Sequence, residues 1–505
     1  MELLLNLAAL LNLLFMIFVL FFERKEDSRR WAWFLVLYFL PVVGILLYIL
    51  LSGHFFTKTK QLTRISHFFD GLTRQFFQEH SDFLKIFFQA LDNPLLEEYK
   101  SLIKMNLVGN KSILAITTSS RIYCWGQELF QDMLSDMEAA TESIYVESFI
   151  IHHDATGQAF MDVLCRKAQQ GVEVKLLYDD VGSILTKKSF FLRLTKAGGQ
   201  VQAFFPVKWR LPLSINFRNH RKITIIDRKI GYMGGVNIGD EYANCSKRKK
   251  PLWRDTHIRL TGTVVSKLQA TFFIDWFTTP AWHTRLKKTE DIAKHFSPET
   301  IQLLQQQLSA TKEAIAKNNF KPEGIPTQII TAGPDDLCST EIEDALIRMI
   351  MDARQYVYIQ TPYFTPNQEF YKALKLAALA GVDVRIMVPD QWDKFYVREA
   401  AYQFIQEMLE FGIKFYHYQG FIHAKTLVSD DKICTIGSTN IDIRSFDLHF
   451  EINAIFYDKS LACQYRDIFE KDMENSRQAS SQWFRAKPLI RRILWPFFKL
   501  FSPLM

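Results

Sequence analysis

The chain has few cysteines and no recognisable metal-binding pattern. Its six cysteines form no CxxC pair, and neither they nor any group of histidines and carboxylates is spaced as metal ligands are. We interpret the cysteines as core or incidental residues, and they leave the redox compartment open. We expect no metal and no other cofactor. The cysteines are Cys124, Cys165, Cys245, Cys338, Cys434 and Cys463.

The N-terminus also lacks the marks of a cleaved signal peptide. No basic stretch precedes the apolar run Leu3–Phe22, and no small-residue cleavage site follows it. This run and a second one, Trp31–Leu51, are each about 20 residues long, enough to span a bilayer. We predict a transmembrane helical hairpin over residues 1–52. Basic residues flank the second run on both sides, so charge does not orient the hairpin.

Composition sets broad limits on the class of protein. A chain of 505 residues exceeds one typical domain, and 48% hydrophobic residues can build a large core. The net charge of +7 suits an acidic partner such as anionic lipid or nucleic acid, but it also suits an ordinary slightly basic protein. Composition alone therefore does not choose a function.

One polar motif occurs twice with identical internal spacing. The first copy, HRKITIIDRKIGYMGGVN, begins at His220, and the second, HAKTLVSDDKICTIGSTN, begins at His423. Such a double match is hard to obtain by accident, so we interpret it as functional. The shared positions are His220, Lys222, Asp227, Gly234, Gly235 and Asn237 in the first copy and His423, Lys425, Asp430, Gly437, Ser438 and Asn440 in the second.

These residue types suit phosphoryl chemistry without a metal. Histidine can attack phosphorus or pass on a proton near neutral pH. Lysine and asparagine can bind phosphate oxygens, and small residues let backbone N–H groups approach them. On a strand, alternation would send the His and Lys of each copy to one face. Two copies supply a nucleophile and a proton donor for one pocket.

The segments before the two motifs also repeat. In the first half, Ser143–Ile151 and Gly171–Tyr178 read as strands around a helix through Lys167. In the second half, Gln355–Phe364 and Gly381–Val388 do the same around a helix through Ala377. Strand–helix–strand order predicts an α/β fold with a mixed sheet flanked by helices in each of two pseudo-twofold lobes.

The paired motif resembles the HKD signature of the phospholipase D superfamily. That resemblance implies two phospholipase D-like lobes, one active site at their interface, a phosphohistidine intermediate and no metal. Further segments, together with the two N-terminal spans, resemble the bacterial cardiolipin synthase family over nearly the whole chain. The segments are Trp253–His257, Gln360–Pro366, Ile443–Phe446 and Phe450–Asn453.

The resemblance implies a reaction and a site. The reaction is phosphatidyl transfer between two phosphatidylglycerol molecules, which gives cardiolipin and glycerol. His220 would be the nucleophile and His423 the acid and base, with Lys222, Lys425, Asn237 and Asn440 on the phosphate oxygens. Asp227 and Asp430 belong to the motif, and we interpret them as structural. As supports we expect Asp255 beside His220 and Glu451 beside His423.

Position 235 departs from the family pattern. The usual motif has serine at this point, as the second copy does with Ser438, whereas the first copy has Gly235. A backbone N–H could replace the phosphate contact that the serine would make.

The predicted domains are a hairpin (1–52), an amphipathic region (53–111), lobe 1 (112–290), a linker (291–325), lobe 2 (326–480) and a basic aromatic tail (481–505). Ser66–Leu91 and the tail either lie on the membrane or cover the lobes. Likewise the basic run Lys247–Lys250 either attracts an anionic headgroup or is a solvated loop.

Several functions remain open from the residues. A membrane-bound hydrolytic phospholipase D or a phosphatidylserine synthase would share the first half-reaction. A nuclease of the superfamily is disfavoured by the apolar N-terminus, and a catalytically silent scaffold by the two intact motifs. We expect phosphatidylglycerol and the membrane as partners, no nucleic acid, and a multi-pass location in the cell membrane. The sequence does not predict an oligomeric state.

Overall fold

The computed structural model describes residues 2–22, 27–51, 93–206, 217–246, 252–279, 324–334 and 340–504. The predicted amphipathic helix Ser66–Leu91, the basic run Lys247–Lys250 and residues 291–323 of the predicted linker lie outside the described residues.

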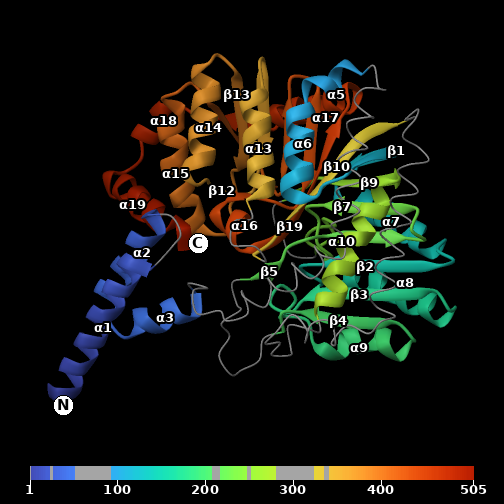
Figure 1. Cartoon of the computed structure of the whole chain (residues 1–505), viewed down its shortest axis with the longest axis horizontal. Helices are drawn as coiled ribbons and strands as arrows, with labels where there is room; N and C mark the ends of the chain where they lie inside the picture. The colour runs from blue at the N-terminus through green and yellow to red at the C-terminus, as the bar shows by residue number, and fades with distance from the viewer. Residues whose placement is uncertain are drawn as a thin grey trace.

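The predicted strands of the two halves join in one continuous sheet (Figure 1). The halves meet where β1 (Leu114–Tyr123) pairs with β10 (Ile325–Ala332) in antiparallel register, with Leu114 opposite Gln328. The prediction of an α/β fold with a mixed sheet is confirmed, and the two lobes share that sheet.

Lobe 1 is built from the strands and helices between β1 and α10. Its strands are β1 (Leu114–Tyr123), β2 (Ser143–Ser148), β3 (Glu173–Asp179), β4 (Gln200–Phe204), β5 (Arg218–Asn219), β6 (Ile223–Ile226), β7 (Ile230–Gly234), β8 (Trp253–Arg254) and β9 (His257–Gly262). Its helices are α7 (Gly126–Glu138), α8 (Ala155–Gln169), α9 (Lys188–Lys196) and α10 (Val264–Thr278).

Lobe 2 runs from β10 to β20. Its strands are β10 (Ile325–Ala332), β11 (Tyr356–Gln360), β12 (Phe364–Thr365), β13 (Asp383–Pro389), β14 (Lys414–Tyr418), β15 (Phe421–Ile422), β16 (Thr426–Ser429), β17 (Ile433–Gly437), β18 (Ile441–Asp442), β19 (His449–Tyr457) and β20 (Ser476–Gln478). Its helices are α13 (Glu341–Asp352), α14 (Gln368–Leu379), α15 (Phe395–Leu409), α16 (Ile443–Asp447) and α17 (Lys459–Glu474).

The two lobes have the same strand order, which makes the pseudo-twofold relation visible. From the centre outward, lobe 1 runs β1-β9-β7-β6-β2-β3-β4 and lobe 2 runs β10-β19-β17-β16-β11-β13-β14. The strands β2, β3 and β4 are parallel, as are β11, β13 and β14, because helices connect them. The motif hairpins β6–β7 and β16–β17 therefore occupy equivalent places.

Helices cover both faces of the sheet. On one face α10 and α17 pack over a core shared by both lobes, with Tyr145, Phe272 and Phe469 among its buried residues. On the other face α7, α8 and α9 cover lobe 1, while α13, α14 and α15 cover lobe 2. Helices α5 (Pro94–Glu98) and α6 (Lys100–Asn110) join the lobe 2 layer.

The N-terminal hairpin differs from its prediction. The first run forms α1 (Glu2–Phe22), but the second is divided into α2 (Asp27–Phe39) and α3 (Val43–Leu51) at Pro41, and Val42 has a left-handed φ of 68°. Proline cannot continue the hydrogen-bond ladder of a helix, which explains the division. Among the helices in the described ranges, none has both the length and the apolarity that crossing a membrane requires.

The N-terminal hairpin contacts the C-terminal turn of the chain. Helix α2 contacts the final turn η2 (Ser502–Leu504), which follows α18 (Ser481–Arg485) and α19 (Leu489–Leu500). Trp33, Leu37 and Tyr48 form a small buried core in the hairpin, and Leu504 packs against it. Figure 1 shows α1 and α2 extending away from the lobes beside the C-terminus.

Candidate active site

The two motif histidines lie where the lobes meet, each bound to a strand of the opposite lobe. Strand β5 pairs in parallel with β19, and the His220 N–H donates to the Phe450 carbonyl oxygen (2.9 Å). Strand β15 pairs in the same way with β8, and the His423 N–H donates to the Arg254 carbonyl oxygen (2.7 Å). These two crossings bring both imidazoles to one interface.

Each histidine binds a carboxylate from the other lobe. Nδ1 of His220 lies 3.0 Å from Oε1 of Glu451, and Nδ1 of His423 lies 2.6 Å from Oδ2 of Asp255. The pairing expected from the sequence, Asp255 with His220 and Glu451 with His423, is therefore wrong. Strand pairing between the lobes explains the difference. Asp255 follows β8, which pairs with β15 just before His423. Glu451 lies in β19, which pairs with β5 just before His220. In each imidazole the carboxylate occupies Nδ1 and leaves Nε2 for chemistry.

The motif lysines are buried beneath the histidines. Lys222 and Lys425 each donate to the carbonyl oxygen of their own motif histidine. Burial lowers the pKa of Lys222 to about 7 and that of Lys425 to about 8, although the Glu451 and Asp255 carboxylates oppose this shift. An anion bound above them would hold both lysines in the charged form.

The two motif asparagines line the pocket described below. Oδ1 of Asn237 accepts a hydrogen bond from the Ile150 N–H (3.3 Å), whereas Oδ1 of Asn440 has no hydrogen-bond partner among the described residues. A buried polar atom without a partner is costly unless a ligand satisfies it. Both side chains line the pocket, and their contact with the substrate stays a prediction.

The two equivalent small residues of the motifs, Ser438 and Gly235, lie beside the carboxylates of Glu451 and Asp255. Ser438 is fully buried and its hydroxyl donates to Oε2 of Glu451. The equivalent Gly235 has no room for a side chain, because a Cβ atom there would lie 2.1 Å from Oδ1 of Asp255. The Gly235 N–H donates to the Thr256 carbonyl oxygen (2.9 Å). The Gly235 N–H itself is therefore engaged within the protein, and the suggestion that a backbone N–H replaces the phosphate contact stays a prediction.

The motif aspartates occupy hairpin turns away from the pocket. Asp227 and Asp430 have left-handed φ angles of 49° and 55° in the tight turns after β6 and β16, a conformation that Asp tolerates. The Asp227 carboxylate accepts from backbone N–H groups of residues 141–143, and that of Asp430 from those of residues 354–356. These contacts anchor the starts of β2 and β11, which agrees with the structural interpretation.

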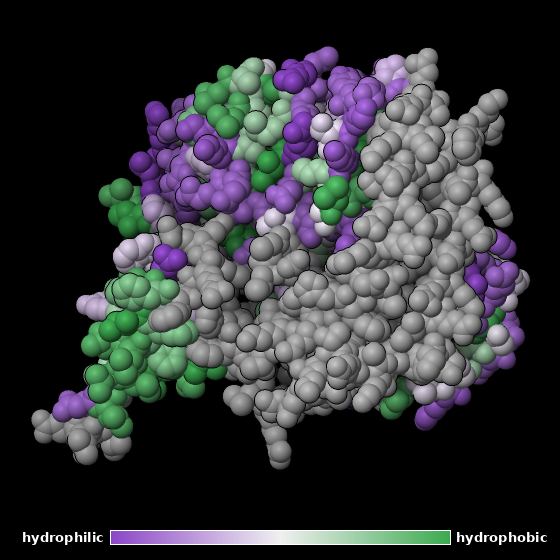
Figure 2. Space-filling view, in the orientation of Figure 1, coloured by the Kyte–Doolittle hydropathy of each residue, from purple (hydrophilic) through white to green (hydrophobic). Residues whose placement is uncertain are grey.

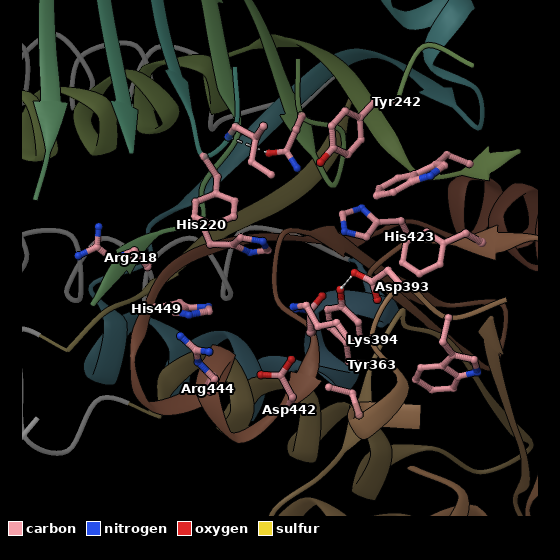
Figure 3. A pocket seen from close by; sticks show the side chains of 18 of the residues that line it. Arg218, His220, Tyr242, Tyr363, Asp393, Lys394, His423, Asp442, Arg444 and His449 are labelled. Carbon is pink, nitrogen blue, oxygen red and sulfur yellow. Dashed lines mark hydrogen bonds between the residues drawn. The ribbon is translucent and has the colours of Figure 1, made fainter. Parts of the chain in front are cut away.

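A pocket of about 630 Å³ opens between the lobes, and both histidines line it. Figure 3 shows the two imidazoles pointing into this space, with Tyr242 on one side and Asp442, Arg444 and His449 on the other. Aromatic side chains surround His423, whose ring centroid lies 5.0 Å from that of Trp253. The lining residues that the sequence did not assign to the site include Tyr242, Trp253, Tyr363, Asp393, Lys394, Asp442, Arg444 and His449.

Some of these residues carried a signal in the sequence. Trp253 and Arg444 lie in segments that resemble the family, and Asp442 and His449 stand close to the second motif. Lys394 and Asp393 precede α15 in a loop after β13, with no pattern that marks them. Only the fold brings that loop to the pocket.

Burial and nearby charge in the pocket favour neutral histidines. Burial, with help from the lysines, lowers the pKa of His423 to about 4 and that of His220 well below its usual value. A neutral His220 can act as a nucleophile. A phosphodiester anion placed between the rings would raise the pKa of His423 toward the range in which it can donate a proton.

Three metal-ligating groups also converge here. Ligand atoms of His220, His449 and Glu451 all lie within 4.8 Å of one another. Ligand spacing along the sequence does not reveal this group, because its members come from different lobes. Two imidazoles and a carboxylate suit zinc. A metal ion there would compete with the hydrogen bond between Nδ1 of His220 and Glu451.

Comparison with known proteins identifies the relatives of this chain. A family profile described as "Cardiolipin synthase, PLD-like domain" matches residues 133–249 and 346–473, and one described as "Phospholipase_D-nuclease N-terminal" matches residues 5–53. The chain is 38% identical over 507 residues to a protein named major cardiolipin synthase of Bacillus subtilis, covering 100% of this chain and 99% of that protein. It is 34% identical over 509 residues to a cardiolipin synthase of Oceanobacillus iheyensis, with the same coverage.

The fold also has a counterpart among solved structures. The crystal structure of phosphatidylserine synthase from Haemophilus influenzae superposes with a TM-score of 0.59 at 15% identity, covering 80% of this chain and all of that one. This likeness concerns the fold alone. Because the relatives match over their full lengths and the duplicated motif forms one interface site, the chain belongs to the cardiolipin synthase family and carries its two phospholipase D-like domains.

Proposed function

We propose that the protein transfers a phosphatidyl group between two phosphatidylglycerol molecules and so makes cardiolipin and glycerol. The observation that carries this proposal is the pair of histidines, each bound to a carboxylate of the opposite lobe, that face one pocket. The full-length relatives named cardiolipin synthase support it. The catalytic residues are His220, Lys222, His423 and Lys425, and the supporting ones are Glu451, Asp255, Ser438, Asn237 and Asn440.

The first half-reaction forms a phosphohistidine. The Nε2 lone pair of His220 attacks the phosphorus of one phosphatidylglycerol. The bond from phosphorus to the headgroup oxygen breaks, and His423 gives its proton to that oxygen, so glycerol leaves. Glu451 stabilises the charge that develops on the His220 ring. Lys222 and Lys425 place positive charge beneath the reacting phosphate.

The second half-reaction reverses these roles. A hydroxyl group of a second phosphatidylglycerol gives its proton to His423 while its oxygen attacks the phosphorus. The bond between phosphorus and Nε2 of His220 breaks, and cardiolipin leaves. Both histidines then have the protons with which they began. Asp255 stabilises His423 in its protonated form.

Product analysis tests this function against its alternatives. Vesicles that contain the full-length protein and labelled phosphatidylglycerol should yield cardiolipin and glycerol, separated by thin-layer chromatography. Phosphatidic acid as the sole product would mean a hydrolytic phospholipase D. Product formed only when serine is added would mean a phosphatidylserine synthase.

Trapping the intermediate tests the mechanism. In a His423→Asn variant, a substrate with a good leaving group should place acid-labile, base-stable phosphate on His220, since release now lacks its base. A His220→Ala variant should retain no label and make no cardiolipin. Label on His423 in a His220→Asn variant, and never on His220, would reverse the assigned roles.

We also propose how the enzyme is held at the membrane. The apolar segment of residues 2–51 inserts into the bilayer, as its sequence predicts, and α19 lies on the surface. Figure 2 shows hydrophobic surface over the N-terminal hairpin. On α19, an apolar row that includes Ile490, Ile493 and Phe497 is more than half exposed. Its other face packs on α15, where Trp495 is buried and donates to Glu399 (2.8 Å).

A further inference from the structure

The catalytic motif is twofold, but the walls of the pocket around it are not. Equal spacing from the two histidines makes Asp442 of lobe 2 equivalent to Gly239 of lobe 1, and Arg444 equivalent to Glu241. Figure 3 shows Asp442 and Arg444 on the side of the pocket opposite Tyr242. Lobe 2 therefore has a cation where its duplicate has an anion.

The strand registers extend this comparison. Gly437 faces Asn453 and Gly234 faces His257, so His449 of β19 is equivalent to Trp253 of β8. Strands β3 and β13 have the same length, and each pairs in the same register with the preceding strand of its lobe. Ile184 lies five residues after the end of β3, and Lys394 lies five residues after the end of β13. Among the described residues, lobe 2 thus presents Lys394, Arg444 and His449 at positions where lobe 1 has Ile184, Glu241 and Trp253.

Lys394 and Arg444, two cations on the lobe 2 side of the pocket, lie near the same carboxylate. Both Lys394 and Arg444 oppose the rise in the pKa of Asp442 that burial causes, so both lie near that carboxylate. Lys394 also contributes to lowering the pKa of His220. Nζ of Lys394 lies 4.8 Å from the ring centroid of Tyr363, and both residues line the pocket. The charge of Lys394 is thus directed at the pocket.

The chemistry of the reaction requires a second anion site. The acceptor lipid carries its own phosphodiester, one glycerol unit away from the hydroxyl group that attacks. In the proposed mechanism the buried Lys222 and Lys425 bind the first phosphate. A second anion in a half-enclosed pocket needs its own cations. Water or another neutral acceptor would have no such need.

We propose that Lys394 and Arg444 bind the phosphodiester of the acceptor phosphatidylglycerol. This inference rests on the proposed function. The pair selects an acceptor that is itself an anionic phospholipid, and Asp442, between the two cations, accepts a hydrogen bond from the acceptor's glycerol. The two parts of the site thereby have different roles. The duplicated motif acts on the transferred phosphate, and the lobe 2 side of the pocket, formed by Lys394, Arg444 and Asp442, binds the second lipid.

Competition between two acceptors tests this site. Full-length enzyme in vesicles is given phosphatidylglycerol and labelled free glycerol, and two products are measured in one assay. One product is cardiolipin, which needs an anionic acceptor. The other is labelled phosphatidylglycerol, which forms when neutral glycerol accepts the phosphatidyl group. The ratio of the products cancels effects on the common first half-reaction.

The variants Lys394→Gln and Arg444→Gln should each lower this ratio by about tenfold, the expected loss of one charge-assisted contact. Arg444→Lys should restore part of it. The control is Arg348→Gln, which removes a surface arginine of α13 paired with Asp352 and should leave the ratio unchanged.

Two outcomes would overturn the proposal. A parallel loss of both products would mean that the cations serve the donor lipid or the fold. An unchanged ratio in both glutamine variants would mean that they bind neither lipid. Failure of the proposed function itself would look different, because the unmodified enzyme would then form labelled phosphatidylglycerol or phosphatidic acid but no cardiolipin.

Discussion

Nδ1 of His220 lies 3.0 Å from Oε1 of Glu451, although the two residues are 231 positions apart and come from different lobes. The reciprocal pair, His423 with Asp255, is separated by 168 positions. Neither motif histidine is hydrogen-bonded to a carboxylate of its own lobe. The active site therefore exists only when β5 pairs with β19 and β15 pairs with β8.

This crossed pairing predicts distinct defects for the two acids. Glu451→Gln should lower kcat by about 10²- to 10⁴-fold, as loss of a histidine-orienting carboxylate does elsewhere, and should prevent formation of the phosphohistidine. Asp255→Asn should instead slow its breakdown, so label accumulates on His220 when the leaving group is good. Measuring the acid-labile label on His220 distinguishes the two defects. If Asp255→Asn prevented formation of the label and Glu451→Gln slowed its breakdown, the pairing first expected from the sequence would be the correct one.

Gly235 should not tolerate a side chain. In Gly235→Ala the new Cβ atom would meet the Asp255 carboxylate at 2.1 Å, so either Asp255 or the strand must move. We expect at least a hundredfold loss of activity, because His423 loses its partner. The matched variant Ser438→Gly removes one hydrogen bond to Glu451 without a clash, and should cost less. Equal activity of Gly235→Ala and the unmodified enzyme would contradict this close contact.

The buried lysines predict an alkaline limit for activity. Lysine is charged below its pKa, and burial lowers the pKa values of Lys222 and Lys425 to about 7 and about 8. kcat/KM reports the free enzyme and should therefore fall as pH rises from 7 to 9. kcat at saturating lipid should persist to higher pH, because the bound phosphate raises both pKa values. A kcat/KM that stays level up to pH 9 would count against the lysines as the phosphate site.

Metal removal and metal addition should have opposite effects. Because the lysines neutralise the phosphate, activity should survive prolonged treatment with EDTA. Added Zn²⁺ should inhibit by binding His220, His449 and Glu451, whose ligand atoms lie within 4.8 Å of one another. EDTA should reverse this inhibition, and His449→Gln should weaken it. Activity lost on chelation and restored by one divalent ion would instead require a metal-dependent mechanism.

The outer face of α19 should contact lipid. A fluorophore attached at Ile493→Cys, in a protein with the exposed Cys245 replaced by serine, should be quenched by brominated lipids in vesicles. The same fluorophore at Leu379→Cys, an exposed position on α14, should not be quenched. Equal quenching at the two positions would mean that α19 does not rest on the membrane. The inner face is excluded from this test because Lys499 and Glu407 form an ion pair there (2.6 Å).

Much of the fold could be read from local patterns. The expected strands before each motif correspond to β2, β3, β11 and β13, and the helix between them is present in both halves. The place of Asp227 and Asp430 also follows from the spacing, since a four-residue strand from Ile223 or Thr426 ends at a tight turn that favours aspartate. Pro41 is visible in the sequence, and its effect on the helix is local, since it divides the second apolar run into α2 and α3.

The duplicated motif, the strand–helix–strand repeat and the reactive side chains were determined by the sequence itself. They depend on residue type and on spacing along one strand, which are local and periodic. The tertiary structure decided which carboxylate serves which histidine, and it brought Lys394 and Arg444 into the pocket. It also grouped His220, His449 and Glu451. These relationships arise from packing between segments far apart in the chain, and the pairings of β5 with β19 and of β15 with β8 that join each histidine to its carboxylate leave no periodic trace in either lobe.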